Sequence, residues 1–359
     1  MKNICIFTNT LQSGGAEKQA VLLSKVLSRE YNVWLVVYYA NLVEPFFLDV
    51  IESEKINIIY LNGNNHLIRI FKLFRFLRNE SIDIIFSYLF TTNFIGGFIG
   101  RICRVPYIIG GIRNSVLSSH KLWMERALHK NILDYSVFNN YSGVNNLVNK
   151  GFKKYKCIVI PNCIEAKTQP IIRNNNNVIT IITVARFVQQ KDFFTSLVAI
   201  KKLISLLYKS KFSIAYKIIG YGYLENQISD WIKELNLNDY VDVIIKPQNL
   251  NEYYINADIY FCTSLFEGLS NSIMEAMSYS LPIMATDVGD NGKIVNDGFN
   301  GYLTNIKDAN GMAQILNKLV INYQLRNKYG QNSYSLIMKK YSIEKFASRY
   351  IEFIEMLDG

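Results

Sequence analysis

Residues 258–277, DIYFCTSLFEGLSNSIMEAM, decide the fold. The first five residues, 258–262, form the apolar run of a short buried strand. Apolar residues then recur at helical spacing from 273 onwards. The segment is therefore predicted to be one strand–loop–helix unit of an α/β sheet.

Two glutamates in this unit are candidate ligand contacts. Gly268 interrupts any continuous helix, so we expect Glu267 in the loop and Glu275 one to two turns into the helix, with Ser270 or Asn271 as N-cap. A helix N-terminus beyond a strand's carboxyl end attracts phosphate, and carboxylates accept hydrogen bonds from hydroxyls, which together suggest a nucleotide sugar. Glutamate early in a helix also favours the macrodipole without a ligand, so the pair alone fits either interpretation.

The composition predicts two domains and an anionic partner. The chain has 359 residues, half of them hydrophobic, which suits two α/β domains. Residues 1–165 carry 19 Lys and Arg against 11 Asp and Glu, whereas the remainder carries 20 against 18. This excess fits membrane phospholipid, a phosphorylated substrate, nucleic acid or plain surface solvation.

Targeting and redox signals favour a cytosolic protein. The five cysteines lack CxxC spacing and are expected to be reduced thiols. No signal peptide is evident behind Lys2. The uncharged run 84–100 is at the lower limit of a membrane span, and a strand at 82–88 followed by a buried helix at 93–103 accounts for it better.

Strands alternate with helices along the first half, which indicates a parallel sheet covered on both faces. The expected strands are Ile4–Thr8, Val33–Tyr38, Ile56–Leu61, Ile82–Tyr88, Tyr107–Gly110, Tyr135–Asn139 and Ile158–Pro161. We therefore assign residues 1–165 to a first Rossmann-like domain on the acceptor side.

A polar segment, 166–177, is expected to be a linker to a second βα series in 178–341. The strands expected there are Val178–Val184, Ile214–Ile219, Val241–Ile245, Asp258–Cys262, Pro282–Thr286 and Tyr302–Leu303. A last helix follows in 342–359. Two doubly wound domains in tandem place a cleft between two rows of strand ends, where ligands commonly bind.

Two further loops at strand ends carry residues that suit phosphate binding. Arg186 and Lys191 follow the strand Val178–Val184, and both cations could reach one diphosphate. Gly220 and Gly222 end the next strand, where backbone can approach a ligand or simply make a tight turn. With the Glu267 loop, three βα units place such groups on one sheet edge.

The chain resembles the retaining GT-B glycosyltransferases of family 4. The matching segments, in chain order, are Gly14-Gly15-Ala16-Glu17, Pro161-Asn162, Arg186 with Lys191, Gly220-Tyr221-Gly222, Glu267 with Glu275, Asp287-Val288-Gly289, and Asp297-Gly298-Phe299-Asn300-Gly301. The resemblance implies a GT-B fold of two Rossmann-like domains, a nucleotide-sugar donor held by 178–341, and a C-terminal helix that crosses back to the first domain.

The resemblance also implies roles for individual residues. Arg186 and Lys191 would clamp the diphosphate, and Glu275 would bind the ribose hydroxyls. Donor sugar and phosphate would be held by Glu267 and by the N–H groups of Gly268, Leu269, Ser270 and Asn271. Gly14 and Gly15 would let their loop close over the phosphates.

No metal or other cofactor is expected. Arg186 and Lys191 would stabilise the departing diphosphate in place of a metal ion, and the chain contains no Asp-x-Asp. The resemblance implies retention of anomeric configuration. Many members have a histidine near the donor sugar; here that region reads 110–115, so Arg113 and Asn114, with Glu17, are the candidate sugar or acceptor contacts.

Residues 66–78 predict a basic amphipathic helix with several phenylalanines. Such a helix suits an anionic membrane surface and a lipid-linked or oligosaccharide acceptor, yet it equally fits a sheet-covering helix whose cations reach solvent. The whole pattern favours a cytoplasmic glycosyltransferase, peripheral at the inner membrane face, that uses a UDP-sugar to build capsule or O-antigen polysaccharide.

Two other functions are disfavoured because the sequence does not contain their motifs. It has no G-x-G-x-x-G turn, which a NAD-dependent oxidoreductase would need to bind the pyrophosphate. Its basic residues form no RNA-binding motif, so no nucleic acid partner is expected. A catalytically silent GT-B scaffold, or a nucleotide-binding subunit at the membrane surface, remains the alternative that only activity decides.

Overall fold

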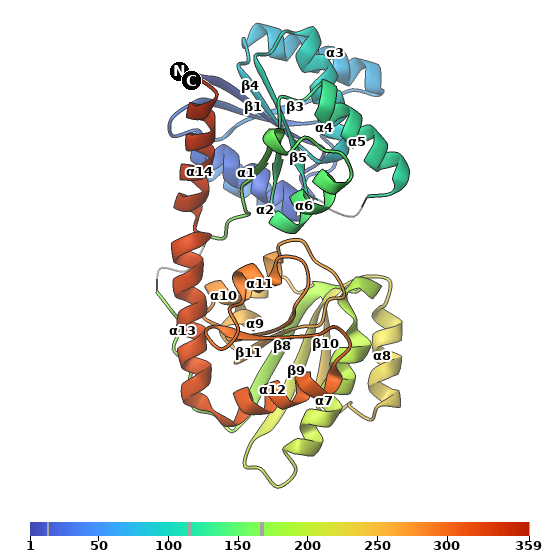
Figure 1. Cartoon of the computed structure of the whole chain (residues 1–359), viewed down its shortest axis with the longest axis vertical. Coiled ribbons are helices and arrows are strands. Elements are labelled where there is room, and N and C mark those ends of the chain that lie inside the picture. Colours follow the sequence, from blue (N-terminus) through green and yellow to red (C-terminus); the bar gives the residue numbers. More distant parts are fainter. Residues whose placement is uncertain (13, 114–116, 166–168, 359) are drawn as a thin grey trace. The chain divides into compact units, whose positions relative to one another are not determined.

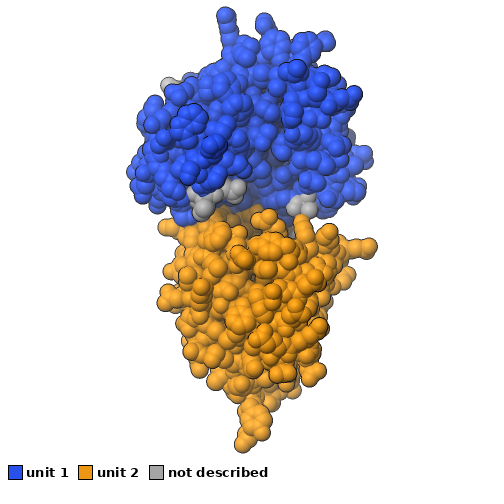
Figure 2. Space-filling view, turned by 90° about the vertical axis from the view of Figure 1, so that its right-hand side faces the viewer, with its two compact units in different colours: residues 1–163, 343–359 blue, residues 164–342 orange. Residues whose placement is uncertain are grey.

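The computed structural model describes residues 1–12, 14–113, 117–165 and 169–358. They form two compact units, coloured separately in Figure 2. Unit 1 comprises Met1–Cys163 and Ile343–Gly359, and unit 2 comprises Ile164–Ser342. Each unit contains a parallel sheet with helices on both faces, which confirms the doubly wound α/β fold predicted from the sequence.

The sheet of unit 1 is built from β1 (Asn3–Thr8), β2 (Asn32–Val37), β3 (Asn57–Tyr60), β4 (Ile84–Tyr88), β5 (Tyr107–Ile112), β6 (Tyr135–Phe138) and β7 (Cys157–Val159). Their order is β3-β2-β1-β4-β5-β6-β7. Alternate residues of β1 enter different cores: Ile4 and Ile6 lie in one, and Cys5 and Phe7 in the other. A continuous apolar run is what a strand buried on both faces requires.

Two layers of helices cover this sheet (Figure 1). One layer consists of α1 (Gly15–Leu27), α2 (Pro45–Ser53) and α14 (Ile343–Met356). The other consists of α3 (His66–Asn79), α4 (Leu89–Ile102) and α5 (Ser119–Asn131). The apolar run 84–100 is therefore β4 followed by α4, as expected. No helix in the described ranges combines the length and apolar composition of a membrane-spanning segment.

The remaining elements of unit 1 are α6 (Tyr141–Asn149) and a 3-10 turn, η1 (Lys154–Lys156). Helix α6 packs with the ends of β5 and β6 around a small core of Ile112, Phe138, Leu147 and Phe152. This group supports the edge of the sheet at β7, which is short.

Unit 2 repeats the plan. Its strands are β8 (Val178–Arg186), β9 (Ser213–Tyr221), β10 (Val241–Ile245), β11 (Ile259–Cys262), β12 (Ile283–Thr286) and β13 (Gly301–Thr304), in the order β10-β9-β8-β11-β12-β13. Its helices are η2 (Gln189–Lys191), α7 (Phe193–Leu206), α8 (Glu225–Glu234), α9 (Leu250–Ile255), α10 (Asn271–Ser278), α11 (Asn291–Ile294), α12 (Ala309–Ile321) and α13 (Tyr323–Lys340).

The strand order reverses once in each sheet. In unit 1 the reversal lies between β1 and β4, and in unit 2 it lies between β8 and β11. Connections leave the two central strands toward opposite faces, and the loops after these strands lie at the carboxyl edge, where open α/β sheets commonly bind ligands. In unit 2 these are the loops that carry Lys191 and Glu267.

Gly330 provides a test of packing in unit 2. A Cβ at this position of α13 would lie 2.2 Å from the carbonyl oxygen of Ser280. Alanine usually stabilises a helix relative to glycine, but here we expect Gly330→Ala to lower the free energy of unfolding by about 1–3 kcal/mol because two backbones must separate. Urea denaturation measures the change. Exposed Gln331→Ala is the control and should stay within about 0.5 kcal/mol; a stabilised Gly330→Ala variant would contradict the packing.

Candidate functional site

Hydrogen bonds tie the loop after β8 to the loop after β11. Leu265 donates its N–H to the carbonyl oxygen of Gln190 at 2.8 Å. The Gln190 side chain donates to the carbonyl oxygen of Phe266 at 2.7 Å. Thr263 Oγ1 donates to the carbonyl oxygen of Lys191 at 2.8 Å. The two loops flanking the reversal of strand order are thus held as one substructure.

An ion pair lies at the centre of this substructure. The Lys191 ammonium contacts Glu267 Oε1, and the same oxygen accepts a hydrogen bond from Ser264 Oγ at 2.8 Å. The Lys191 and Glu267 side chains are 14% and 9% exposed. Because little of either side chain is exposed, salt screens their attraction less than that of a fully exposed pair. Arg186 is the last residue of β8 and is exposed. Its guanidinium forms no ion pair with any residue that the structure describes.

Glycines allow three loops to approach each other at this edge. A Cβ on Gly289, where φ is 58°, would lie 2.1 Å from the carbonyl oxygen of Glu267. Asp290 donates its N–H to the carbonyl oxygen of Gly268 at 2.9 Å. The loop after β12 therefore supports the Glu267 loop directly.

Gly220 and Gly222 are explained by packing. A Cβ on Gly220 would lie 1.9 Å from the carbonyl oxygen of Ala185, and one on Gly222 would lie 2.5 Å from that of Phe187. The end of β9 thus presses against the end of β8. This contact accounts for both glycines and fixes the strand that ends in Arg186.

The loop that leads into α10 contains backbone N–H groups with no carbonyl acceptor among the described residues. Ser270 is the N-cap by position, as expected, but its side chain makes no capping bond, and its Oγ lies 3.3 Å from Ser272 Oγ. Within the described part of the chain, no carbonyl oxygen accepts from the N–H groups of Gly268, Leu269 or Ser270. Free N–H groups at a helix N-terminus are a general binding site for phosphate.

Glu275 is oriented by a buried tyrosine. Tyr254 Oη donates to Glu275 Oε2 at 3.3 Å, and the Tyr254 ring stacks on Tyr279 with centroids 5.1 Å apart. Burial, and then the nearby Glu275 carboxylate, raise the pKa of Tyr254 well above its ordinary value. Tyr254 therefore stays protonated and donates a hydrogen bond that orients the side chain of Glu275, which lies on the second turn of α10.

In unit 1 the start of α1 is locally satisfied. Gly14 is its N-cap and Gly15 its first residue. Glu17 Oε1 accepts from Thr10 Oγ1 at 3.2 Å, and a Cβ on Gly14 would lie 2.1 Å from Glu17 Oε2. The Glu17 side chain thus folds back over Gly14, and its hydrogen bond with Thr10 orients it there.

Arg113 lies at the carboxyl edge of the same sheet. It donates to Asn162 Oδ1 at 2.9 Å, and its guanidinium lies 4.6 Å from the centre of the Tyr88 ring. Its Nε is buried without a partner among the described residues. Two contacts therefore orient the cation, whereas Asn114, its companion in the prediction, lies outside the described residues.

Sequence analysis missed a buried polar cluster behind this edge. Asn93 accepts from the Gly111 N–H at 3.1 Å and donates to the Gly111 carbonyl oxygen at 3.2 Å. It also donates to Glu125 Oε1 at 3.4 Å, while Glu125 Oε2 has no partner among the described residues. Burial raises the pKa of Glu125 to about 7. The sequence did not indicate a role for Glu125, because it is the single acidic residue of an otherwise basic helix.

The raised pKa of Glu125 predicts a pH-dependent stability. Between its ordinary pKa of 4.5 and about 7, the unfolded chain releases this proton and the folded chain retains it. The contribution of Glu125 to the free energy of unfolding should therefore fall as pH rises through that window. Burial lowers the pKa of His129 to about 4, which adds a contribution of opposite sign below pH 6.5. Glu125→Gln, which stays neutral, should therefore make the slope of unfolding free energy against pH more positive in urea titrations from pH 5 to 8; a slope equal to that of the unmodified protein would contradict the assignment.

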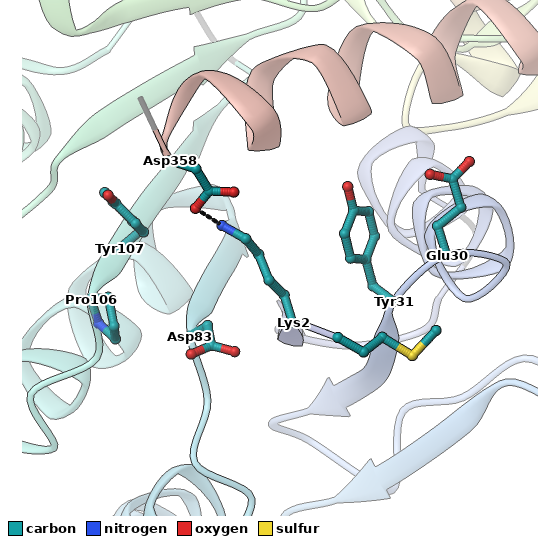
Figure 3. A pocket seen from close by; sticks show the side chains of 8 residues that line it. Lys2, Glu30, Tyr31, Asp83, Pro106, Tyr107 and Asp358 are labelled. Carbon is teal, nitrogen blue, oxygen red and sulfur yellow. Dashed lines mark hydrogen bonds and ion pairs between the residues drawn. The ribbon is translucent and has the colours of Figure 1, made fainter.

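A pocket of about 510 Å³ opens at the opposite edge of the unit 1 sheet. Figure 3 shows the Lys2 side chain reaching Asp358 across it, with Tyr107 and Tyr31 on either side. Asp83 and Tyr107 lie at the amino ends of β4 and β5. This pocket is remote from the carboxyl edge, and an internal ion pair occupies its centre, so we assign it no ligand.

No group of three or more His, Cys, Asp or Glu that could hold a metal lies in the described ranges. The candidate ligand groups of unit 2 are cations, carboxylates and free N–H groups. This set suits a diphosphate joined to hydroxyl-bearing rings.

Comparisons with known proteins agree with this chemistry. Residues 165–336 match the family model of glycosyl transferases group 1. A Campylobacter jejuni protein is 23% identical over 367 residues, covering 99% of this chain and 98% of its own: GalNAc-alpha-(1->4)-GalNAc-alpha-(1->3)-diNAcBac-PP-undecaprenol alpha-1,4-N-acetyl-D-galactosaminyltransferase. The Escherichia coli UDP-Gal:alpha-D-GlcNAc-diphosphoundecaprenol alpha-1,3-galactosyltransferase is 22% identical over 345 residues, 88% of this chain and 86% of its own.

A solved structure shares the fold. Anabaena HepE, crystallised with UDP-glucose, superposes with a TM-score of 0.83 at 16% identity, covering 99% of this chain and 100% of HepE. The expected GT-B fold is thereby confirmed. Together, the matched domain and the fold support a GT-B glycosyltransferase.

Proposed function

We propose that this protein is a cytoplasmic glycosyltransferase that moves a sugar from a UDP-sugar to a glycan or polyprenyl-diphosphate-linked acceptor, with retention of configuration. The product would be a bacterial-type surface polysaccharide such as a capsule or O-antigen. The observation that carries the proposal is the partly buried Lys191–Glu267 ion pair at the reversal of strand order in unit 2.

The donor diphosphate lies beside Lys191 and Arg186 in this proposal. Lys191 supplies a localised charge, and the free guanidinium of Arg186 can bind two oxygens at once. Phosphate oxygens also accept from the N–H groups at the start of α10. Glu267 and Glu275 accept hydrogen bonds from the hydroxyls of the sugar and the ribose, respectively.

The same groups would assist the bond cleavage. Transfer breaks the bond from the anomeric carbon to the diphosphate oxygen, and the departing nucleoside diphosphate keeps the electron pair. Fixed donors and cations stabilise the charge that develops on it, without a metal ion. For retention, the departing oxygen accepts the proton of the acceptor hydroxyl, whose oxygen bonds to the anomeric carbon on the same face.

The acceptor assignment rests on similarity. The Campylobacter and Escherichia coli relatives are named for undecaprenyl-diphosphate-linked substrates. A lipid-linked acceptor would bring the protein to the inner face of the cytoplasmic membrane. Arg113, held by Asn162 and Tyr88, is the unit 1 group proposed to contact the sugar or acceptor.

Calorimetric titration with UDP, GDP and NAD tests the donor site. We expect UDP to bind, NAD not to bind, and Arg186→Ala to weaken UDP binding by about 10–100-fold, because a charge-assisted contact to phosphate is lost. Lys202→Ala, which removes an exposed cation of α7, is the matched control.

The outcomes separate the alternatives. Binding of GDP alone would keep the site and change the donor base. Equal UDP affinity in Arg186→Ala and the unmodified protein would remove Arg186 from the site. Folded protein that binds none of the three would contradict the proposal and favour a silent scaffold.

A further inference from the structure

The two helical layers of unit 1 differ in charge. The layer of α3, α4 and α5 contains eight Lys or Arg and one carboxylate, Glu125, which is 3% exposed. The layer of α1, α2 and α14 contains four Lys or Arg and six Asp or Glu. The basic excess of the first half of the chain is therefore concentrated on one face of its sheet.

Helix α3 is apolar on two sides. Leu73, Phe76 and Leu77 bury one side against the sheet, as a covering helix requires. The opposite side exposes Leu67 and Phe71, at 77% and 60%. Sheet covering explains only the first side, so the second needs another occupant.

Cations alternate with the apolar residues on this outward side. One helical face carries Leu67, Ile68, Phe71, Lys72, Arg75 and Arg78, all exposed. Arg69 instead lies over the Tyr39 ring, with its guanidinium carbon, Cζ, 4.9 Å from the ring centre. The outward side thus mixes hydrocarbon and positive charge without a carboxylate.

The neighbouring helix α4 extends the apolar surface. Its Gly96 and Gly100 lie against the sheet, which lets the helix pack closely. Phe94, Phe98 and Ile102 recur every fourth residue on its outer side and are exposed, with the Phe94 and Phe98 rings 4.8 Å apart. Cys103, at the C-cap of α4, donates to the Phe74 carbonyl oxygen of α3. Helices α3 and α4 therefore lie side by side (Figure 1), and their outer sides together are called here the α3–α4 face.

We propose that the α3–α4 face docks on an anionic phospholipid surface. The aromatic and aliphatic side chains enter the headgroup region, and the lysine and arginines pair with lipid phosphates. Charge complementarity selects this occupant, because the face offers no carboxylate to a basic partner. The proposal deepens the proposed function, since docking would bring unit 1 to a lipid-linked acceptor.

Co-sedimentation with vesicles tests the docking. The intact protein should bind vesicles of equimolar phosphatidylglycerol and phosphatidylcholine, and bind poorly to phosphatidylcholine alone. Lys72→Gln/Arg75→Gln/Arg78→Gln should weaken the anionic partition coefficient on the order of a hundredfold. Leu67→Ser/Phe71→Ser should weaken it by about tenfold or more.

Matched controls exclude effects of net charge and general stickiness. Lys201→Gln/Lys202→Gln/Lys209→Gln removes three exposed cations from unit 2, and Phe46→Ser/Leu48→Ser removes exposed apolar residues from α2 on the other layer. Both controls should bind vesicles as the intact protein does. An equal loss of vesicle binding in the control variants would overturn the proposal. Absence of vesicle binding by the intact protein would also overturn it, and an acidic protein would then be the candidate partner for the α3–α4 face.

UDP titration of the same variants separates this proposal from the donor site. The docking variants should bind UDP like the intact protein. Vesicle binding without UDP binding would support the face and contradict the donor site. UDP binding without vesicle binding would support the donor site and contradict docking of the α3–α4 face.

Discussion

The salt bridge between Lys191 and Glu267 joins the loops after the two central strands of unit 2. Parallel order and the reversal between β8 and β11 bring these loops to the same edge, and glycine at 289 lets a third loop support them from behind. The pair fixes the Lys191 ammonium at this edge. The backbone N–H groups of Gly268, Leu269 and Ser270, which have no carbonyl acceptor among the described residues, lie in the loop that leads into α10. In the proposed function, the donor diphosphate would bind to this cation and these N–H groups.

Local pattern predicted the elements well and the contacts between them poorly. The β11–loop–α10 unit could be read from apolar spacing and Gly268, because each signal lies within 20 residues. The Lys191–Glu267 pair spans 76 positions and the Asn93–Glu125 contact spans 32, so no local signal specified either one. Gly220 and Gly222 were predicted as ligand-approach or turn residues, and the structure shows that both pack against the backbone at the end of β8. The predicted roles of all these residues toward a ligand stay predictions.

The helix at 66–78 shows why a pattern can fit two interpretations at once. Its apolar residues occupy more than one side, so the sequence supported both sheet covering and membrane contact. In the structure Leu73, Phe76 and Leu77 cover the sheet, while Leu67 and Phe71 remain exposed beside cations. The contribution of Phe94 and Phe98 could not be predicted, because only the fold brings α4 beside α3. One layer of unit 1 thus serves the core on one side and offers a basic apolar surface on the other.

Sugar transfer by Lys191 variants tests the central claim most directly, namely that the donor is bound and cleaved at the edge between β8 and β11. With a UDP-sugar and a polyprenyl-diphosphate-linked acceptor, the account predicts that Lys191→Ala lowers turnover by about 100-fold or more, because a cation facing the departing diphosphate is lost and Glu267 remains uncompensated. Lys191→Arg should restore part of the turnover. Because Lys191→Ala leaves the Glu267 carboxylate unpaired, it should also lower the melting temperature, so turnover is compared at a temperature at which circular dichroism shows all variants folded. Turnover of folded Lys191→Ala equal to that of the unmodified protein would contradict the account.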